Sequence, residues 1–175
     1  MVSAKTALIL NYTGNSYHWG CFGTSTEIYL SLTEKGYIVN YFDVRTMHGL
    51  KPYPSRETTF DKNFHQEYFN SNSCLRNALE TSDILVVNGE GTMHHYNGGQ
   101  SNILFLMHYF RNVLGKPVHL INHSFLPDGT GKPNADFDPI YETVAKTLTT
   151  VIPREKVSMD VLTRMGIKTI QGFDC

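Results

Sequence analysis

Residues 81–92 read TSDILVVNGEGT, and this stretch decides the fold class. Its run from Ile84 to Val87 is apolar on both faces of an extended chain, which is typical of a strand buried inside a parallel sheet. The ends of the strand are marked by turn-forming residues, Asp83 before the run and Asn88 and Gly89 after it. We therefore expect residues 83–88 to form the central strand of an α/β sheet.

Strand and helix patterns alternate along the rest of the chain. Short apolar runs bounded by polar residues, glycine or proline predict strands at residues 4–12, 37–44, 83–88, 118–122, 149–152 and 168–171. Helices are expected at residues 24–35, 101–114, 138–147 and 155–165, with a weaker helical stretch that ends with residues 74–80. The alternation predicts one α/β domain over residues 1–175, a doubly wound, mostly parallel, Rossmann-like sheet with helices on both faces.

Two local details follow from turn and cap residues. Thr24 and Glu27 have the spacing of a capping box, and Gly36 suits the end of a helix, so the first helix is expected to begin at Thr24. Residues 45–60 contain Pro52 and Pro54 and are expected to form a loop.

Composition excludes several classes of protein. The 175 residues are 41% hydrophobic and 18% charged, which excludes a disordered chain and provides for a sizeable core. A net charge of −1 does not provide the excess of positive charge that is typical of proteins that bind nucleic acid or anionic membranes. Three cysteines without a CxxC pair indicate neither a disulfide framework nor a zinc ribbon. The apolar run at residues 7–10 is too short for a signal peptide or transmembrane segment, so we expect a cytoplasmic protein.

Polar residues follow the predicted strands, where a doubly wound sheet binds its ligands. These candidate site residues are Asn15, His18 and Trp19 after the first strand, Asn88, Gly89, Glu90, Gly91, Thr92 and His94 after the third, Asn122 and His123 after the fourth, and Arg154 after the fifth. Because the carboxyl ends of parallel strands meet at one edge, we expect these residues to converge there.

Glu90 is the only formal charge between residues 88 and 110. It is either a general base toward a hydroxyl or a partner that holds His94 or Arg154. Gly89 and Gly91 either form a tight turn or bring backbone N–H groups to a phosphate or sugar oxygen. The dinucleotide and ATP glycine fingerprints are absent, so neither nucleotide is predicted as a cofactor.

The remaining candidates also have two interpretations each. His123 is a proton donor and acceptor, or a buried hydrogen-bonded histidine. Trp19 is a stacking platform for a sugar, or a lid over the core. Arg154 clamps a carboxylate or phosphate, or pairs with Glu155 or Asp174. Because no His-Glu-x-x-His or similar spacing occurs, no metal site is expected.

Four segments of the chain share a pattern with a known family. They are His18-Trp19-Gly20-Cys21, then Asp83 to His94 with Asn88-Gly89-Glu90-Gly91-Thr92 at its centre, then Lys116-Pro117-Val118 leading to Asn122 and Ser124, and finally Arg154-Glu155-x-x-Ser158. Together they resemble the polysaccharide pyruvyl transferase family. Many members carry three glycines where this chain has Gly89-Glu90-Gly91, so the resemblance is closest to a subgroup with glutamate there.

This resemblance implies an activity and an architecture. It implies the transfer of the enolpyruvyl group of phosphoenolpyruvate onto a sugar of a cell-surface polysaccharide or glycan, as a pyruvate ketal. Phosphoenolpyruvate is then a co-substrate, and no other cofactor is expected. The family has two Rossmann-like domains in a glycosyltransferase-B-like (GT-B-like) arrangement, and this chain matches the N-terminal, acceptor-side half. A C-terminal domain is then the missing partner.

The resemblance also distributes roles. Asn15, His18, Trp19, Thr92, His94 and Asn122 would hold the acceptor sugar, while Glu90 or His123 would orient or deprotonate its hydroxyl as catalytic residues. Arg154 would reach the carboxylate of the donor or support the loop. Two other functions stay open: a GT-B-like glycosyltransferase that uses a nucleotide sugar, and a non-catalytic glycan-binding domain.

Overall fold

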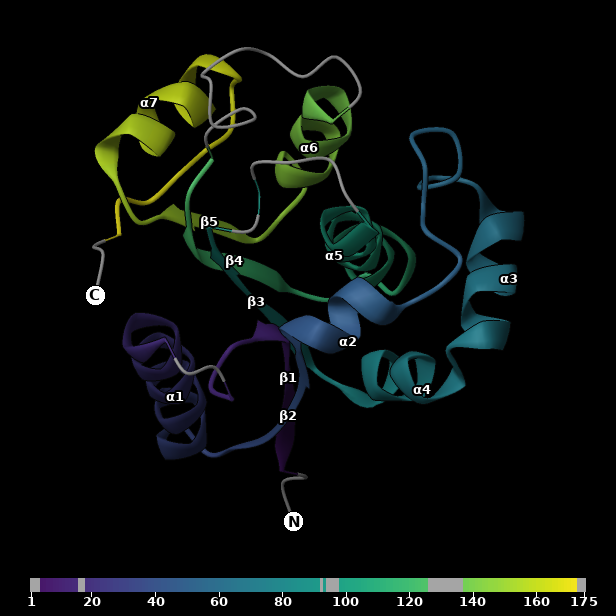
Figure 1. Ribbon diagram of the computed structural model, residues 1–175, viewed down its shortest axis with the longest axis horizontal. Helices are drawn as coiled ribbons and strands as arrows, with labels where there is room; N and C mark the ends of the chain where they lie inside the picture. Colours follow the sequence, from purple (N-terminus) through teal and green to yellow (C-terminus); the bar gives the residue numbers. More distant parts are fainter. Residues whose placement is uncertain (1–3, 16–17, 92, 94–97, 126–136, 173–175) are drawn as a thin grey trace.

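A computed structural model describes residues 4–15, 18–91, 93, 98–125 and 137–172. Within these ranges the core is a five-stranded, all-parallel sheet with the order β2-β1-β3-β4-β5. The strands are β1 (Lys5–Tyr12), β2 (Tyr37–Asp43), β3 (Ile84–Glu90), β4 (Val118–His123) and β5 (Thr150–Pro153) (Figure 1). The α/β class is confirmed, and the DILVVN segment is the central strand, as its two apolar faces predict.

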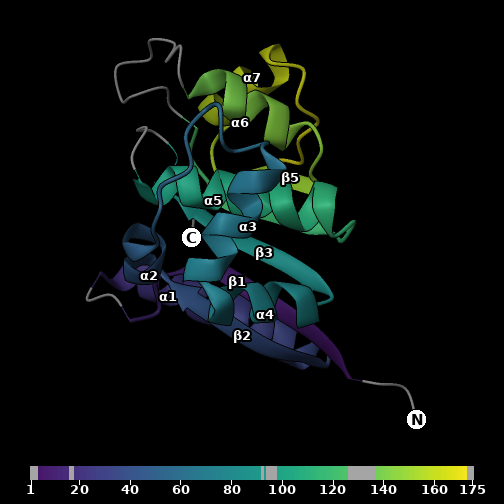
Figure 2. The same ribbon diagram turned by 90° about the vertical axis from the view of Figure 1, so that its right-hand side faces the viewer.

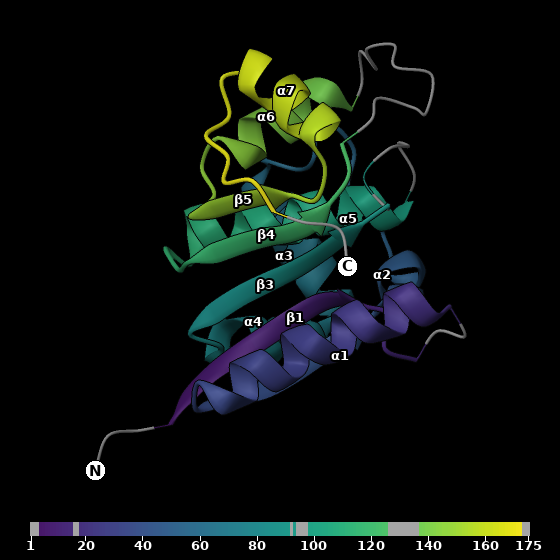
Figure 3. The ribbon, with the colours of Figure 1, turned by 90° about the vertical axis from the view of Figure 1, so that its left-hand side faces the viewer.

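Helices cover both faces of the sheet. Figure 3 shows α1 (Trp19–Glu34) lying across one face. The opposite face, in front in Figure 2, carries α2 (Val44–Gly49), α3 (Lys62–Ser71), α4 (Ser73–Thr81), α5 (Gly98–His108) and α6 (Asp138–Ala145). A π-helical segment, η1 (Tyr109–Val113), continues α5, and α7 (Lys156–Arg164) follows β5. The right-handed crossover from β1 to β2 runs toward one edge of the sheet, whereas the crossovers from β2 to β3, β3 to β4 and β4 to β5 run toward the other edge. The helices in these two sets of crossovers therefore lie on opposite faces.

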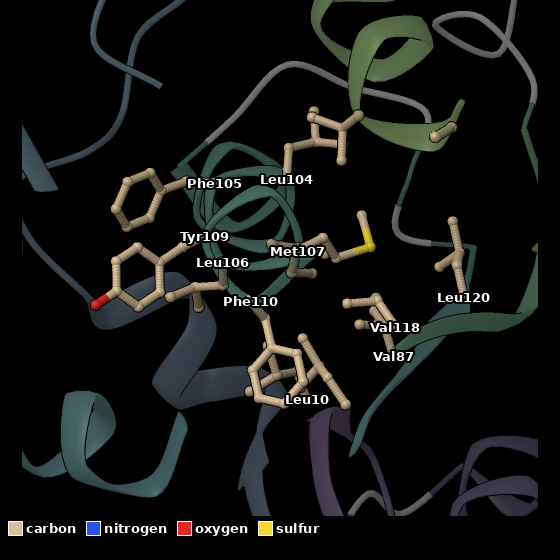
Figure 4. Close-up of a cluster of buried hydrophobic side chains, with 14 of the residues drawn as sticks. Leu10, Val87, Leu104, Phe105, Leu106, Met107, Tyr109, Phe110, Val118 and Leu120 are labelled. Carbon is tan, nitrogen blue, oxygen red and sulfur yellow. The ribbon is translucent and has the colours of Figure 1, made fainter. Parts of the chain in front are cut away.

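Helix α5 lies at the centre of the hydrophobic core, as its nearly uniform apolar sequence predicts. Residues from Gly99 to Met107 are all buried. In Figure 4, Met107 and Phe110 point toward Val87, Val118 and Leu10 of the sheet, while Phe105 points the other way. On that side the ring of Phe105 contacts Tyr68 of α3, with 4.5 Å between centroids. Helix α5 therefore joins the sheet to an outer layer of helices.

The predicted start of the first helix is wrong. Helix α1 begins at Trp19, five residues before Thr24, so the Thr24–Glu27 capping box does not form. The Thr24 hydroxyl instead donates to the carbonyl of Gly20, one turn earlier in the same helix. Two glycines in this first part disfavour a helix by about 1 kcal/mol each. A tertiary contact favours this first turn nevertheless, because the side chain of Cys21 hydrogen-bonds to Glu90 of β3.

Two other predicted segments differ. Residues 168–171 do not form a sixth strand, although the amides of Ile170 and Gly172 donate to Val151 and Pro153 and hold this segment beside β5. Residues 45–60 are not all loop, because α2 occupies their beginning. The carboxylate of Asp43 caps this short helix by accepting from the amide of Thr46 at 2.7 Å. In place of the weaker helical stretch that the sequence predicts, the structure has two helices, α3 and α4.

The helices in the described ranges are all too short or too polar to cross a lipid bilayer.

Two histidines with lowered pKa values, the fully buried His123 and the half-buried His108, predict a pH-dependent stability. Burial lowers the pKa of His108, at the end of α5, to about 4, with a further contribution from the charge of His65. Burial likewise lowers the pKa of His123, at the end of β4, to about 4. In the unfolded chain both titrate near pH 6.5, so the unfolded state binds more protons between these values.

We therefore expect the free energy of unfolding to fall as the pH is lowered from 7.5 to 5. The expected loss is on the order of 2 kcal/mol for His123 and about 1 kcal/mol for His108, whose charge is partly screened by solvent. Urea unfolding at the two pH values measures it, and His108→Gln should remove about a third of the difference. The lowered pKa values of Asp43 and Asp83 act in a separate window, below about pH 4. A stability that stays constant from pH 7.5 to 5 would contradict the burial of both imidazoles.

Candidate functional site

Three adjacent strands end in an unusual backbone conformation. In the described ranges, the non-glycine residues with positive φ are Asn11 at 60°, Glu90 at 41° and Asn122 at 50°. They lie at or near the carboxyl ends of β1, β3 and β4, which are neighbours in the sheet. A left-handed residue costs about 1–3 kcal/mol unless its surroundings hold it, and such residues gather at functional sites. The strand order also reverses between β1 and β3, which is where open α/β sheets bind ligands.

Glu90 is held by hydrogen bonds from several elements. One carboxylate oxygen accepts from the hydroxyl of Thr13 at 2.5 Å and from the amide of Asn88 at 2.9 Å. The residue is 9% exposed, so its charge is largely shielded from solvent. Burial, followed by the hydrogen bond to Glu90 and its charge, raises the pKa of the Cys21 thiol to about 11. Cys21 is therefore a protonated donor at neutral pH and not a nucleophile.

Other polar side chains hold Thr13 and Asn88, the partners of Glu90, in place. The hydroxyl of Ser25, in α1, accepts from the backbone amide of Thr13 and from the side chain of Asn88, each at 2.9 Å. Asn88 also accepts from the side chain of Asn122 at 2.8 Å, and its carbonyl accepts from Asn11 at 2.7 Å. The network thus connects β1, α1, β3 and β4, and it sets the orientation of Glu90.

Removing the Ser25 hydroxyl should be costly. Ser25→Ala is expected to lower the free energy of unfolding by about 2 kcal/mol, because two buried N–H donors would lose their acceptor. Ser31→Ala, on the same helix, is the matched control, since its hydroxyl contacts only the exposed Glu27 in the described structure, and its effect should be under about 0.5 kcal/mol. Chemical unfolding of the two variants measures the difference. Equal stabilities would mean that Ser25 does not anchor the network.

A cavity of about 210 Å³ opens beside this network. It is lined by His18, Gly20, Cys21, Thr24, Glu90, Asn122 and Arg154. We call it the Glu90 cavity. Its wall combines a carboxylate, a guanidinium, an imidazole and an amide, so it offers both donors and acceptors to a small polar ligand. Four of the predicted site residues, His18, Glu90, Asn122 and Arg154, are brought together here.

Arg154 and Glu155 form one hydrogen-bonded unit with the chain that follows β4. The Nε of Arg154 donates to the hydroxyl of Ser124 at 2.7 Å and lies 3.4 Å from a carboxylate oxygen of Glu155. Ser158 donates to the other oxygen of Glu155 and accepts from the amide of Phe125 at 2.7 Å. The Arg154–Glu155 pairing is thus present, and Arg154 also lines the Glu90 cavity. Asp174, the other predicted partner, lies outside the described residues.

His123 is fully buried and is not among the residues that line the Glu90 cavity. Its Nε2 hydrogen-bonds to the hydroxyl of Tyr141, and its Nδ1 has no partner among the described residues. Burial keeps the imidazole neutral at pH 7, since its pKa is lowered to about 4. Gly89 lies against it: a Cβ added to Gly89 would be 2.1 Å from the Cβ of His123. Close packing between β3 and β4 therefore requires this glycine.

The other predicted residues are dispersed or undescribed. Trp19 is 85% exposed on the first turn of α1, with its ring edge on Phe22, so the prediction of a lid over the core is wrong. Its role as a sugar platform stays a prediction. Asn15 lines a neighbouring cavity between β1 and β2, and Gly91 is half-buried after Glu90. Thr92 and His94 lie outside the described residues.

The structure adds residues that sequence patterns did not single out. Thr13 and Ser25 are buried partners in the Glu90 network, and Tyr141 is the partner of His123. Their contacts join residues far apart in the chain, so no local pattern signals them. Among the described residues, no three His, Cys, Asp or Glu side chains are grouped so that they could hold a metal ion.

A comparison of the chain with models of protein families and with curated proteins finds no match. Two sources therefore bear on function: the geometry of the Glu90 cavity and the motifs in the sequence.

Proposed function

We propose that this chain is the acceptor-binding domain of a cytoplasmic polysaccharide pyruvyl transferase, and that the Glu90 cavity holds the sugar that receives the pyruvyl group. The observation that carries the proposal is the placement of Glu90. This carboxylate is fixed by Thr13 and Asn88, has a strained backbone, and lines a polar cavity together with Arg154. The type of reaction is assigned from the four sequence segments that resemble the family.

The reaction has a definite proton balance. A sugar hydroxyl oxygen bonds to the central carbon of phosphoenolpyruvate, whose methylene carbon takes up a proton and becomes a methyl group. The carbon–oxygen bond to phosphate breaks, and inorganic phosphate leaves. A second hydroxyl of the sugar then bonds to the same carbon and closes the ketal. Two protons leave the sugar hydroxyls in all. One is matched by the proton that the new methyl group takes up, and the other is carried away by the phosphate.

Each residue of the cavity has a role in this scheme. Glu90 accepts the proton of the attacking hydroxyl as a general base. Arg154 faces the carboxylate or phosphate of phosphoenolpyruvate, for which its planar donors are suited. His18 and Asn122 hydrogen-bond to other hydroxyls of the sugar. His123, because it is buried and neutral, is a positioning residue that packs against Gly89 and supports the end of β3.

The test uses the full-length product of the gene with phosphoenolpyruvate and a panel of oligosaccharides. We expect phosphate release that depends on the acceptor, together with a pyruvylated sugar detected by mass spectrometry. Release of a nucleoside diphosphate from a nucleotide sugar, without phosphate release from phosphoenolpyruvate, would contradict the proposal and favour a glycosyltransferase. Sugar binding without turnover of either donor would favour a glycan-binding protein instead.

A further inference from the structure

A second cavity lies beside the Glu90 cavity, at the carboxyl ends of β1 and β2. It has a volume of about 320 Å³ and is lined by Tyr12, Thr13, Asn15, His18, Asp43, Val44 and Arg45. We call it the Asp43 cavity. His18 lines both cavities, and Thr13, in the wall of this one, donates to Glu90. The two cavities are therefore neighbours, with His18 in the wall of each.

The Asp43 cavity presents charged groups in a fixed arrangement. Asp43 accepts from the amide of Thr46 at 2.7 Å and from its hydroxyl at 2.8 Å, which holds the carboxylate in place. The amide hydrogen bond is the main reason that the pKa of Asp43 is lowered, so its carboxylate is ionised at neutral pH and accepts hydrogen bonds. Arg45 lies near enough to contribute to the same lowering. One negative and one positive side chain leave the cavity without net charge.

An aromatic ring completes the wall. The ring of Tyr12 stacks on Tyr41 with 4.2 Å between centroids, so neighbouring side chains hold it in place. A sugar offers an apolar C–H face to such a ring and hydroxyl groups that both donate and accept. The carboxylate of Asp43 and the amide of Asn15 match those hydroxyls. A phosphate group fits less well, because Asp43 offsets the charge of Arg45.

We propose that the Asp43 cavity is a subsite for a second sugar residue of the acceptor, adjacent to the sugar whose hydroxyl faces Glu90. This inference rests on the proposed function, and it goes further by assigning an acceptor of at least two sugar units. Binding energy from the second sugar would hold the first in the Glu90 cavity. Specificity would then be set partly by residues at the end of β2.

The test compares matched sugars by titration, followed through the backbone amide signals of the isotope-labelled protein. The probes are the methyl glycosides of glucose, galactose and N-acetylglucosamine, with maltose, lactose and chitobiose as their two-unit counterparts. We expect one-unit sugars to shift the signals of Gly20, Cys21 and Asn122. At least one two-unit sugar should also shift Asn15 and Arg45 and bind about tenfold more tightly.

Variants assign the extra affinity. Asp43→Asn keeps a side chain that can cap α2, and Arg45→Ala changes an exposed residue, so both should fold. Both are expected to remove most of the two-unit advantage and to leave one-unit binding unchanged. Arg76→Ala, an exposed arginine on α4, is the control and should change neither.

The outcomes separate the two proposals. Two-unit sugars that bind no more tightly than one-unit sugars, with shifts confined to the Glu90 cavity, would overturn the second subsite and leave the proposed function standing. Shifts confined to the Asp43 cavity would support a sugar site there and count against the proposed role of Glu90. If none of the six sugars shifts a signal in either cavity, both proposals are overturned.

Discussion

Replacing Gly89 by alanine is expected to lower the free energy of unfolding by about 3 kcal/mol. The new Cβ would lie 2.1 Å from the Cβ of His123 and 3.1 Å from its Cα. Both residues belong to paired strands at the centre of the sheet, where Glu90 is in register with His123. Neither backbone can move away without breaking the ladder between β3 and β4. Urea unfolding measures the loss.

A glycine in open space provides the control for this substitution. Gly23, in α1, has no atom within 4 Å of an added Cβ, so Gly23→Ala should stabilise the protein by up to about 1 kcal/mol. If Gly89→Ala yields no folded protein, the same substitution is made in a His123→Gly background. There the added Cβ has room, so Gly89→Ala should lower the free energy of unfolding by clearly less than about 3 kcal/mol relative to His123→Gly alone. Gly89→Ala and Gly23→Ala variants of equal stability would refute the close packing of β3 on β4.

If the proposed function holds, changing Glu90 to glutamine is expected to reduce turnover by the full-length protein about 100-fold or more. Glutamine keeps the shape of the side chain, and its oxygen can still accept from Thr13 and Asn88. It cannot accept the proton of a sugar hydroxyl, so the chemistry should fail while the fold remains. Phosphate release from phosphoenolpyruvate with a saturating acceptor measures the rate. Glu34→Gln, the same chemical change on the exposed end of α1, should leave the rate unchanged.

The same variant has a readout that does not depend on the reaction. The charge of Glu90 and its hydrogen bond both contribute to the raised pKa of Cys21. In Glu90→Gln the thiol pKa should fall toward its ordinary value, although burial, the largest cause, remains. A disulfide reagent should therefore react with Cys21 faster, measured in a Cys74→Ala/Cys175→Ala background. Full turnover in Glu90→Gln with a changed Cys21 reactivity would confirm the contact and reject the role of Glu90 as base.

The sheet is predictable because its signals are local. The run from Ile84 to Val87 is apolar on both faces, and its place at the centre of the sheet follows from that alone. The edge on which the site forms follows too, since parallel strands end together. The start of α1 is not predictable in this way, because a tertiary contact between Cys21 and Glu90 stabilises a glycine-containing first turn.

The site itself was predictable only in part. The residues at the strand ends identify His18, Glu90, Asn122 and Arg154, which line one cavity. They do not reveal that His123 is buried, because that depends on how closely β3 and β4 pack at Gly89. Nor do they indicate Ser25, whose partner Asn88 lies 63 residues away. Pairings of this kind arise from the twist and register of the whole sheet.

The long sequence separations within the Glu90 network bear on when the site comes into being during synthesis and folding. Thr13 and Glu90 are 77 residues apart, and Asn122 joins Asn88 across another 34. A nascent chain that has released only β1, α1 and β2 contains Thr13 and Ser25, but it contains neither Glu90 nor Asn88, so the network cannot yet form. A sugar that binds only to the folded cavity would therefore stabilise the folded chain against unfolding, as any ligand specific to the native state does.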